Sequence, residues 1–300
     1  MTNRRWAALL MGSLMMVRGT VPVLAVPADT LGLRSSASLR YPPGLTTPSG
    51  RAPAAVRYPS VPFVVSCTVA GVLADDPIVH PGKPGMSHMH TFFGSMTIGA
   101  SMSVATMQRA RTTCNNAGDH AAYWVPSPVG TRLRAYYDAG PLDPASIVAY
   151  TPDSQLVAGD RTARAAIGID VLAFRCGAVG DGPDGVGWLA LAPPVCSKGA
   201  ARIARLSFAQ CWDAISTSYG SMTATVGKTC PPGHAVAVPR LRLLVEVPKT
   251  AVSSGPLTSF HGDFLNGWSP SVLADLVKVC IRGERTSNVE LKRCGLPGGQ

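Results

Sequence analysis

The chain has 300 residues and a formal net charge of +10, from 27 Lys and Arg against 17 Asp and Glu. Seven of the arginines but only one acidic residue lie in residues 1–60, so the remaining charge is too dilute to predict a nucleic-acid-binding face. The 31 glycines and 26 prolines argue against a helical bundle and favour a fold rich in strands and loops.

Residues 1–28 have the pattern of a secretory signal peptide: a basic start, a short apolar run and small residues where cleavage would occur. An uncleaved membrane anchor is the alternative, but Arg18 interrupts the run where a spanning helix stays apolar. Residues 29–60 are rich in Pro, Ser, Gly and Arg and predict a flexible linker. We therefore expect a secreted protein without a transmembrane segment, whose globular domain spans residues 61–282.

Eight cysteines follow the linker, and their even number beside an export signal predicts four disulfides in an oxidising compartment. They are Cys67, Cys114, Cys176, Cys196, Cys211, Cys230, Cys280 and Cys294. No two are spaced CxxC, so a thiolate zinc site is not expected. The sequence leaves the pairing open, although we expect Cys294 to tether the polar tail, residues 283–300.

Short strands separated by turns make up most of the domain. Strands are predicted over residues 61–69, 132–137 and 241–247, the last with a proline on either side. A helix is predicted after Ser269, because Pro270 suits a first helical turn and apolar residues follow at helical spacing. This pattern predicts a mainly β, antiparallel sandwich or jelly roll, folded as one disulfide-stabilised domain with a few short helices.

The segment 75–94, DDPIVHPGKPGMSHMHTFFG, is the densest polar stretch. His88 and His90 are spaced i, i+2, which on a strand places both imidazoles on one face with Cα atoms about 7 Å apart. Metal sites and acid–base pairs both use this arrangement. The alternative is a hydrogen-bonded turn with two exposed histidines. Five methionines lie in or near the segment and would suit copper, although methionine more often fills gaps in apolar packing. They are Met86, Met89, Met96, Met102 and Met107.

A second polar cluster lies in residues 260–268, FHGDFLNGW. His261 and Asp263 again share the i, i+2 spacing, and Asp263 could orient a histidine, act as a base or ligate a metal. Asn266 and Trp268 come just before the predicted helix. The alternative is that Asp263 and Asn266 satisfy backbone groups in the turn that leads into this helix.

Aromatic residues beside carboxylates suggest a sugar-binding surface, although burial in a core is the commoner role of any one ring. Asp119, Tyr123 and Trp124 lie in GDHAAYWVP, and Tyr136 lies in AYYDAG. His234 ends the segment CPPGH, where a cysteine and two prolines would fix its position; a plain surface turn is the alternative.

Several catalytic signatures are missing from the sequence: the GxSxG elbow, the P-loop, GxGxxG after a strand, and HExxH. The chain has only three glutamates, so an acid–base carboxylate is expected among the aspartates. The candidates are Asp75, Asp76, Asp119, Asp213 and Asp263.

Seven ordered segments together resemble a secreted family of bacteria and fungi that is catalogued as domain of unknown function DUF1996. They are DPIVHPGKPGMSHMHTFFG at 76–94, AAYWVPS at 121–127, AYYDAG at 135–140, AGD at 158–160, FAQCWD at 208–213, CPPGHAVAVPRLRLLVEVP at 230–248 and FHGDFLNGW at 260–268. The family pattern falls on Asp76, His88, His90, Tyr123, Trp124, Asp213, His234, His261, Asp263 and Trp268.

Fungal proteins similar to this family are often joined to carbohydrate-binding modules of the cell-wall type, which implies a role at a polysaccharide or cell wall. The chain departs from the family in one place. Members commonly carry a stretch resembling DHxSHxAYP after the CWD segment, whereas residues 216–228 contain no histidine. If that histidine belongs to the family's active centre, the departure implies an altered centre here.

From these observations we expect a secreted enzyme that acts on an extracellular polysaccharide by hydrolysis or lyase-type chemistry. The catalytic centre is predicted at His88, His90, His261, Asp263 and Asp76. Substrate binding is predicted at Tyr123, Trp124, Tyr136, Asp119, Asn266, Trp268 and His234. The cofactor stays open, with a divalent metal at His88 and His90 as the candidate.

Two alternatives remain: a non-catalytic carbohydrate-binding or cell-envelope protein, and a copper- or zinc-binding protein. In each case the expected partner is a polysaccharide or envelope polymer and not a nucleic acid, and a monomer is expected.

Overall fold

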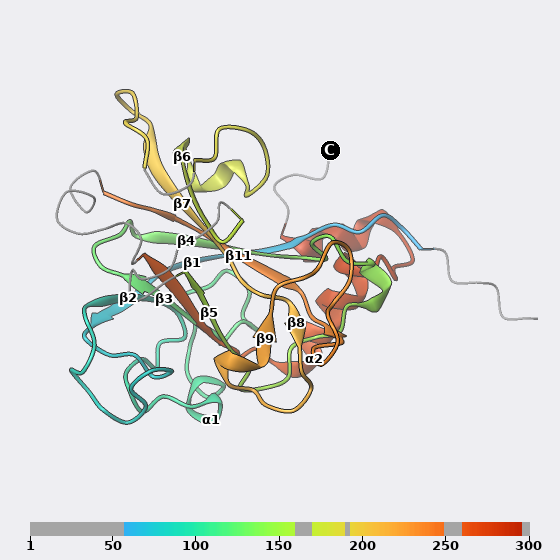
Figure 1. Ribbon diagram of the computed structural model, residues 1–300, viewed down its shortest axis with the longest axis horizontal. Helices are drawn as coiled ribbons and strands as arrows, with labels where there is room; N and C mark the ends of the chain where they lie inside the picture. Colours follow the sequence, from blue (N-terminus) through green and yellow to red (C-terminus); the bar gives the residue numbers. More distant parts are fainter. Residues whose placement is uncertain (1–56, 160–169, 190–192, 249–259, 296–300) are drawn as a thin grey trace, which may run out of the picture. The chain divides into compact units, whose positions relative to one another are not determined.

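The structure is a computed structural model that describes residues 57–159, 170–189, 193–248 and 260–295 (Figure 1). The predicted signal peptide and all but the last four residues of the predicted linker lie outside the described residues. In the part of the chain that the structure describes, helices are too short or too polar to cross a membrane.

Nine strands form one antiparallel sheet. They are β1 (Phe63–Leu73), β2 (His90–Gly94), β3 (Ala122–Pro126), β4 (Arg132–Asp138), β5 (Gln155–Gly159), β6 (Leu172–Gly177), β7 (Ala201–Ser207), β11 (Arg240–Glu246) and β12 (His261–Leu265). Their order in the sheet is β5-β12-β3-β2-β1-β4-β11-β7-β6. The predicted strands at 61–69, 132–137 and 241–247 correspond to β1, β4 and β11, displaced by a few residues at most.

A second sheet and several short helices complete the described fold. The sheet has the order β10-β8-β9, from β8 (Cys211–Trp212), β9 (Met222–Thr223) and β10 (Val236–Ala237). The helices are α1 (Val104–Met107), α2 (Pro270–Leu276), the π-helical turn Val277–Ile281, and the 3-10 turns Pro144–Ser146, Val179–Asp181, Tyr219–Ser221 and Asn288–Cys294.

The long strand β1 belongs to both halves of the large sheet. Its residues 63–68 pair with β4, and its residues 69–73 pair with β2. The register shifts between Val69 and Gly71, and an irregularity of this kind bends a strand and increases its twist. One half therefore consists of β5, β12, β3 and β2, and the other of β4, β11, β7 and β6.

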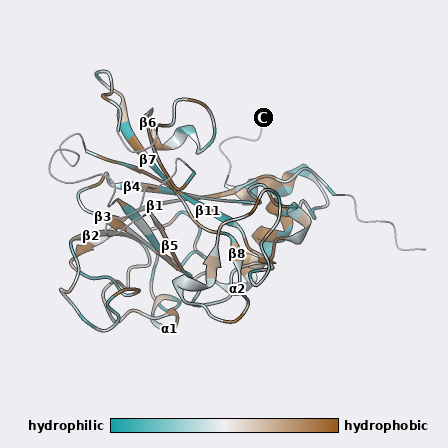
Figure 2. Ribbon diagram, viewed as in Figure 1, coloured by the Kyte–Doolittle hydropathy of each residue, from teal (hydrophilic) through white to brown (hydrophobic). Residues whose placement is uncertain are grey.

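The two halves face each other across one hydrophobic core. Tyr137 of β4 lies 6.4 Å from Phe264 of β12, measured between ring centroids. Gly262 of β12 faces Leu206 of β7 so closely that a Cβ on the glycine would lie 2.6 Å from a leucine methyl group. Hydrophobic residues concentrate on β2, β3 and the α2 segment (Figure 2). The predicted mainly β, antiparallel sandwich-like fold with few short helices is confirmed.

Residues 74–89 and 95–110, the covering segments on either side of β2, lie over the outer face of the first half. Phe92 and Trp124 stack on this face with ring centroids 5.4 Å apart. Ile78 and Met107, from the covering segments, are buried in the same cluster. Because side chains alternate along a strand, His90, His261 and Asp263 also point to this outer, covered face.

All eight cysteines form disulfides, as predicted. The pairs, which the sequence left open, are Cys67–Cys114, Cys176–Cys196, Cys211–Cys230 and Cys280–Cys294. The last pair joins the turn Asn288–Cys294 to the π-helical turn that follows α2. The predicted helix begins at Pro270 as expected, although the Ser269 side chain makes no capping hydrogen bond among the described residues.

Candidate metal centre

Three neighbouring strands bring two distant histidines together. His90 of β2 is paired with Pro126 of β3. In the antiparallel pair of β12 and β3, Asp263 lies opposite Trp124. Two residues further along, His261 lies opposite Pro126. The two histidines therefore lie in one row on either side of a proline, which has no long side chain to separate them. Their Nε2 atoms are 3.2 Å apart.

The other end of the His90 ring is fixed by a backbone group. Nδ1 of His90 lies 2.9 Å from the carbonyl oxygen of Asp75. A carbonyl oxygen only accepts hydrogen bonds, so Nδ1 carries the proton and donates it. In the neutral ring, the Nε2 atom that faces His261 is then left with its lone pair, which is the arrangement that metal-bound histidines use.

Asp263 completes a convergence of electron-donating atoms. Its Oδ2 atom lies 3.5 Å from Nε2 of His261, and both side chains are fully buried. Nε2 of His261 thus faces a carboxylate on one side and the Nε2 lone pair of His90 on the other. Either His261 donates a proton to one of these acceptors, or all three atoms surround a cation.

Two overlapping groups of side chains could hold a metal ion among the described residues. His88, His90 and His261 form one group, and Asp76, His90 and Asp263 form the other. Within each group the potential ligand atoms lie within 4.8 Å of one another. His88 is the exposed member, and its ring centroid is 4.3 Å from that of His90 and 5.1 Å from that of His261.

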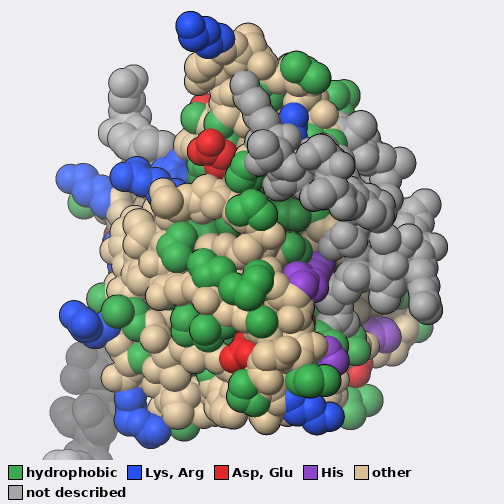
Figure 3. Space-filling model, turned by 90° about the vertical axis from the view of Figure 1, so that its left-hand side faces the viewer, with side chains coloured by type: hydrophobic (Ala, Val, Ile, Leu, Met, Phe, Trp, Pro, Cys, Tyr) green, Lys and Arg blue, Asp and Glu red, His purple; other side chains and the backbone are tan. Residues whose placement is uncertain are grey.

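The spacing of the two Nε2 atoms fits a metal ligand pair. Zn–N bonds of about 2.0–2.1 Å at a tetrahedral angle place two nitrogens about 3.3 Å apart, close to the observed 3.2 Å. Imidazole and carboxylate are also ligands that zinc accepts, and imidazole suits copper. The donor set therefore fits a divalent metal, and exposed His88 gives the centre an open side. Histidine side chains reach the surface on the face drawn in Figure 3.

The two adjacent aspartates at the start of the first covering segment have different roles. The Asp75 carboxylate accepts hydrogen bonds from the backbone of Gly85 (2.7 Å) and Ala100 (3.0 Å), which fixes the covering segments over the site. Asp76 is buried, and its Oδ1 atom accepts from the backbone of Ile78 and Val79. The sequence offered Asp75 as a catalytic acid, but it could not show that its carbonyl group orients His90.

Trp124 lies in the next row of the sheet, between its strand partners Asp263 and Phe92. Its side chain is fully buried, and its indole N–H has no acceptor among the residues that the structure describes. A buried donor of this kind requires a partner, which an ordered water molecule or a bound ligand can supply. This unsatisfied group lies on the same sheet face as the histidines.

The aromatic residues predicted to stack on sugars are buried. Tyr123 and Trp124 have no exposed surface, Trp268 is 1% exposed and Tyr136 is 5% exposed. A sugar ring could not stack on any of these four in this conformation. Tyr123 and Trp268 face the central core, and Tyr136 packs on the outer face of the second half.

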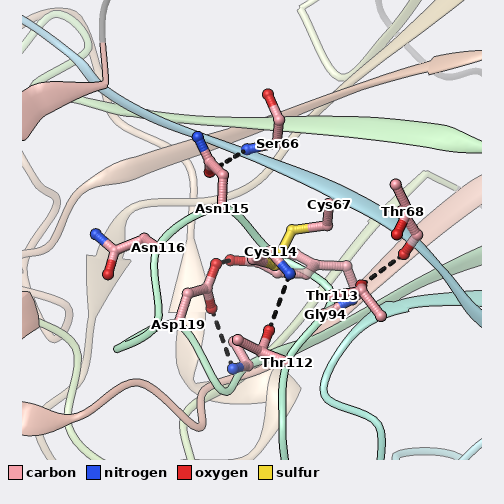
Figure 4. Close-up of a disulfide and its surroundings, with 12 residues drawn as sticks. Ser66, Cys67, Thr68, Gly94, Thr112, Thr113, Cys114, Asn115, Asn116 and Asp119 are labelled. Atoms are coloured by element: carbon pink, nitrogen blue, oxygen red, sulfur yellow. Dashed lines mark hydrogen bonds between the residues drawn. A yellow bond between two sulfur atoms is a disulfide. The ribbon is translucent and has the colours of Figure 1, made fainter.

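Asp119, predicted to contact substrate, lies at the end of a buried hydrogen-bonded chain. The indole N–H of Trp268 donates a hydrogen bond to the Tyr137 hydroxyl (3.2 Å). The Tyr137 and Tyr123 hydroxyls are hydrogen-bonded to each other (2.5 Å), and the Tyr123 hydroxyl donates to Asp119 (2.8 Å). Burial raises the pKa of Asp119 to about 8. The carboxyl lies beside the Cys67–Cys114 disulfide (Figure 4), whose sulfurs are bonded to each other, so this cluster is no thiolate metal site.

The remaining predicted residues lie apart from the histidine centre. Asn266 donates to the carbonyl of Thr151 (2.8 Å) and accepts from the backbone of Trp268, so it stabilises the turn before α2, as the alternative interpretation held. His234 lies in a turn closed by a hydrogen bond from its backbone to Pro231. The histidine-free segment 216–228 packs beside β5, where Gln155 donates to the carbonyl of Thr217.

Fold and site together define a β-sheet protein with a buried histidine–aspartate centre under the covering segments. The model of the family described as a domain of unknown function, DUF1996, matches residues 76–268, which is more than half of the chain. The chain therefore belongs to this family, as the ordered motifs indicated. No curated protein and no solved structure matches it.

Proposed function

We propose that this protein is a metal-dependent enzyme that cleaves an extracellular polysaccharide, by hydrolysis or by lyase-type chemistry. The observation that carries the proposal is the convergence of His90 Nε2, His261 Nε2 and the Asp263 carboxylate, with the His90 lone pair already oriented by Asp75. Atoms of this kind, buried together, repel one another's lone pairs unless a proton or a cation lies between them.

The residues divide into ligands and proton carriers. His90, His261 and Asp263 would hold the metal, and exposed His88 would close or open its fourth position. A bound divalent metal supplies a nucleophilic hydroxide at neutral pH or polarises an oxygen of the substrate. Asp76 is fixed by two backbone amides, and a carboxylate oxygen of it lies within 4.8 Å of potential ligand atoms of His90 and Asp263, so it is placed to accept or return a proton.

Three features support an extracellular polysaccharide as the substrate. The basic and apolar start of the chain is typical of an export signal. Four disulfides are typical of an oxidising, extracellular compartment. Fungal proteins that resemble this family are often joined to carbohydrate-binding modules.

The metal is tested on the disulfide-intact protein by elemental analysis and by titration with zinc and with copper. We expect one metal ion per chain, and at least a tenfold loss of affinity in His90→Ala and His261→Ala. His120→Ala is the matched control, because His120 bonds the carbonyl of Ala110 and belongs to neither metal group among the described residues. A wild-type protein that binds neither metal would overturn the metal centre.

The reaction is tested by incubating the metal-loaded protein with neutral and acidic polysaccharides and measuring new reducing ends and unsaturated products. We expect cleavage of at least one polymer, lost in His90→Ala and kept in His120→Ala. Metal binding without any cleavage across the panel would contradict the enzymatic part and leave a metal-binding protein.

A further inference from the structure

A cavity of about 750 Å³ lies at the edge of the sheet, against β5, the strand that pairs with β12. One wall is β5, from Val157 to Gly159, and the opposite wall is the end of β7 and the residues after it, from Arg205 to Gln210. We call this cavity the β5–β7 groove. Both strands are labelled in Figure 1.

The β5 wall is made of the direct neighbours of two centre residues. Val157 is the strand partner of Asp263, and Gly159 is the strand partner of His261. Partners in an antiparallel pair have Cα atoms about 4.5–5.5 Å apart. The backbone of the β5 wall therefore lies one strand spacing from the backbone of His261 and Asp263.

Gly159 leaves the junction between groove and centre without a side chain. Its φ is +92°, and a Cβ there would lie 2.5 Å from the carbonyl oxygen of Phe260. Both facts require glycine at this position. As a result, no side chain of Gly159 stands between the groove and His261.

The charges that line the groove are balanced. Arg205, Arg240 and Arg242 face Asp170 and Asp184, and Asp138 lies behind them. Arg240 and Arg242 both donate to Asp138, each at 3.0 Å from its Nε atom.

Arg242 also binds the second carboxylate, at 2.6 Å from Asp184. This hydrogen bond lowers the pKa of Asp184, so its carboxylate stays ionised. Three guanidinium groups are thus matched by three carboxylates. A polyanion entering the groove would have to displace these carboxylates and would meet their repulsion.

A neutral polyhydroxylated chain meets no such conflict. Carboxylates accept hydrogen bonds from sugar hydroxyls, and guanidinium groups donate to them. Ser207, Gln210 and Thr225 line the same groove and can do both. We infer that the β5–β7 groove binds a neutral polysaccharide and presents it to the histidine centre. This inference deepens the proposed function and rests on it.

The test measures binding separately from cleavage. Neutral oligosaccharides (β-glucan and chitin fragments) and polygalacturonate fragments are titrated calorimetrically into wild type and into His90→Ala, which lacks the proposed metal site. We expect the neutral fragments to bind both proteins equally and polygalacturonate to bind neither.

Two kinds of variant act on the groove itself. Ala224→Trp places a large ring in it, because Ala224 is exposed and lines the groove, and should weaken neutral-fragment binding at least about tenfold. Val226→Trp is the matched control, since Val226 is 66% exposed in the same segment but does not line the groove. Ser207→Ala with Thr225→Val removes two hydroxyls at little cost in volume and should weaken binding about fivefold for each lost hydrogen bond.

The outcomes separate this inference from the proposed function. Unchanged binding in both groove variants, or tighter binding of polygalacturonate than of neutral fragments, would overturn the groove. Neutral-fragment binding that Ala224→Trp weakens, in a wild type that takes up neither zinc nor copper, would keep the groove and remove the metal-dependent reaction. Cleavage that persists in Ala224→Trp with unchanged KM would remove the groove alone.

Discussion

A single hydrogen bond decides how His90 can act. Because the Asp75 carbonyl oxygen accepts a hydrogen bond from Nδ1–H, Nε2 is the nitrogen that faces His261. The sequence spacing predicted His88 and His90 as a pair on one strand face; their ring centroids lie 4.3 Å apart, but His88 precedes β2 and is exposed, whereas His90 is buried. The spacing could not predict which nitrogen faces His261, because this depends on a loop carbonyl 15 residues earlier.

Asp119 shows the opposite case, a carboxyl that matters for stability rather than chemistry. Its pKa of about 8 in the folded protein lies above the value of about 3.9 in an unfolded chain. The fold therefore prefers the protonated form. This contribution to stability is fully present below about pH 4 and is lost as the pH rises to about 8.

We expect Asp119→Asn to change how stability depends on pH. The amide stays neutral at every pH. The melting temperature of the variant relative to that of wild type should therefore rise by several degrees from pH 4 to pH 8. Asp143→Asn is the control, because Asp143 is exposed and caps a surface turn. Thermal melts across this pH range that run parallel for wild type and Asp119→Asn would contradict the assignment.

At the scale of elements, β3 lies between the two strands that carry the histidines of the proposed metal centre. Strands β2 and β12 lie two spacings apart, about 10 Å, and the imidazoles meet above β3 at Pro126. A longer side chain on this strand end would stand between the two rings.

We therefore expect Pro126→Tyr to reduce metal affinity at least about tenfold while the protein stays folded. Pro126→Ala makes the side chain smaller and should bind metal as wild type does. Metal titration followed by a circular dichroism spectrum checks both variants. Equal metal affinity in Pro126→Tyr and Pro126→Ala would show that the rings do not meet as described.

Strand boundaries were accessible from local sequence, but the pairing of strands was not. Strands β4 and β11 were predicted because polar and apolar residues alternate in one and prolines bound the other. The burial of both aromatic residues of β3 could not be predicted in this way. Tyr123 and Trp124 point to opposite faces of the sheet, and both faces are covered. No pattern in one strand reveals that the residues on either side of β2, 74–89 and 95–110, fold back over its outer face.

At the scale of the whole molecule, the disulfides differ in the length of the loop that each one closes. Cys67–Cys114 closes a loop of 47 residues and joins β1 to the segment before β3, whereas Cys280–Cys294 closes one of 14 residues near the end of the described chain. In the chain-entropy model the longer loop is worth about 4 kcal/mol and the shorter about 3 kcal/mol.

Replacing both cysteines of the long loop by alanine should therefore lower the free energy of unfolding more than the same change in the short loop. Urea denaturation of the two double variants measures the difference. The metal affinity of the folded Cys67→Ala, Cys114→Ala variant should stay unchanged, since neither cysteine belongs to the histidine groups. A larger loss from the short loop would contradict this order.

The net charge of +10 is distributed unevenly along the chain. Most of it lies in residues 1–60, and the groove beside the centre balances its own arginines with aspartates. The arrangement of Arg240, Arg242 and Asp138 therefore favours a neutral polymer over an acidic one.

The 171 residues between His90 and His261 have a consequence for how the chain finds its fold. A slip of β12 by one residue would turn His261 and Asp263 into the core and bring Phe264 out. Such a sheet would lack the proposed metal site. With the proposed centre, metal ions present during refolding would stabilise only chains in which β12 is correctly aligned on β3, and would therefore select the correct register of the sheet.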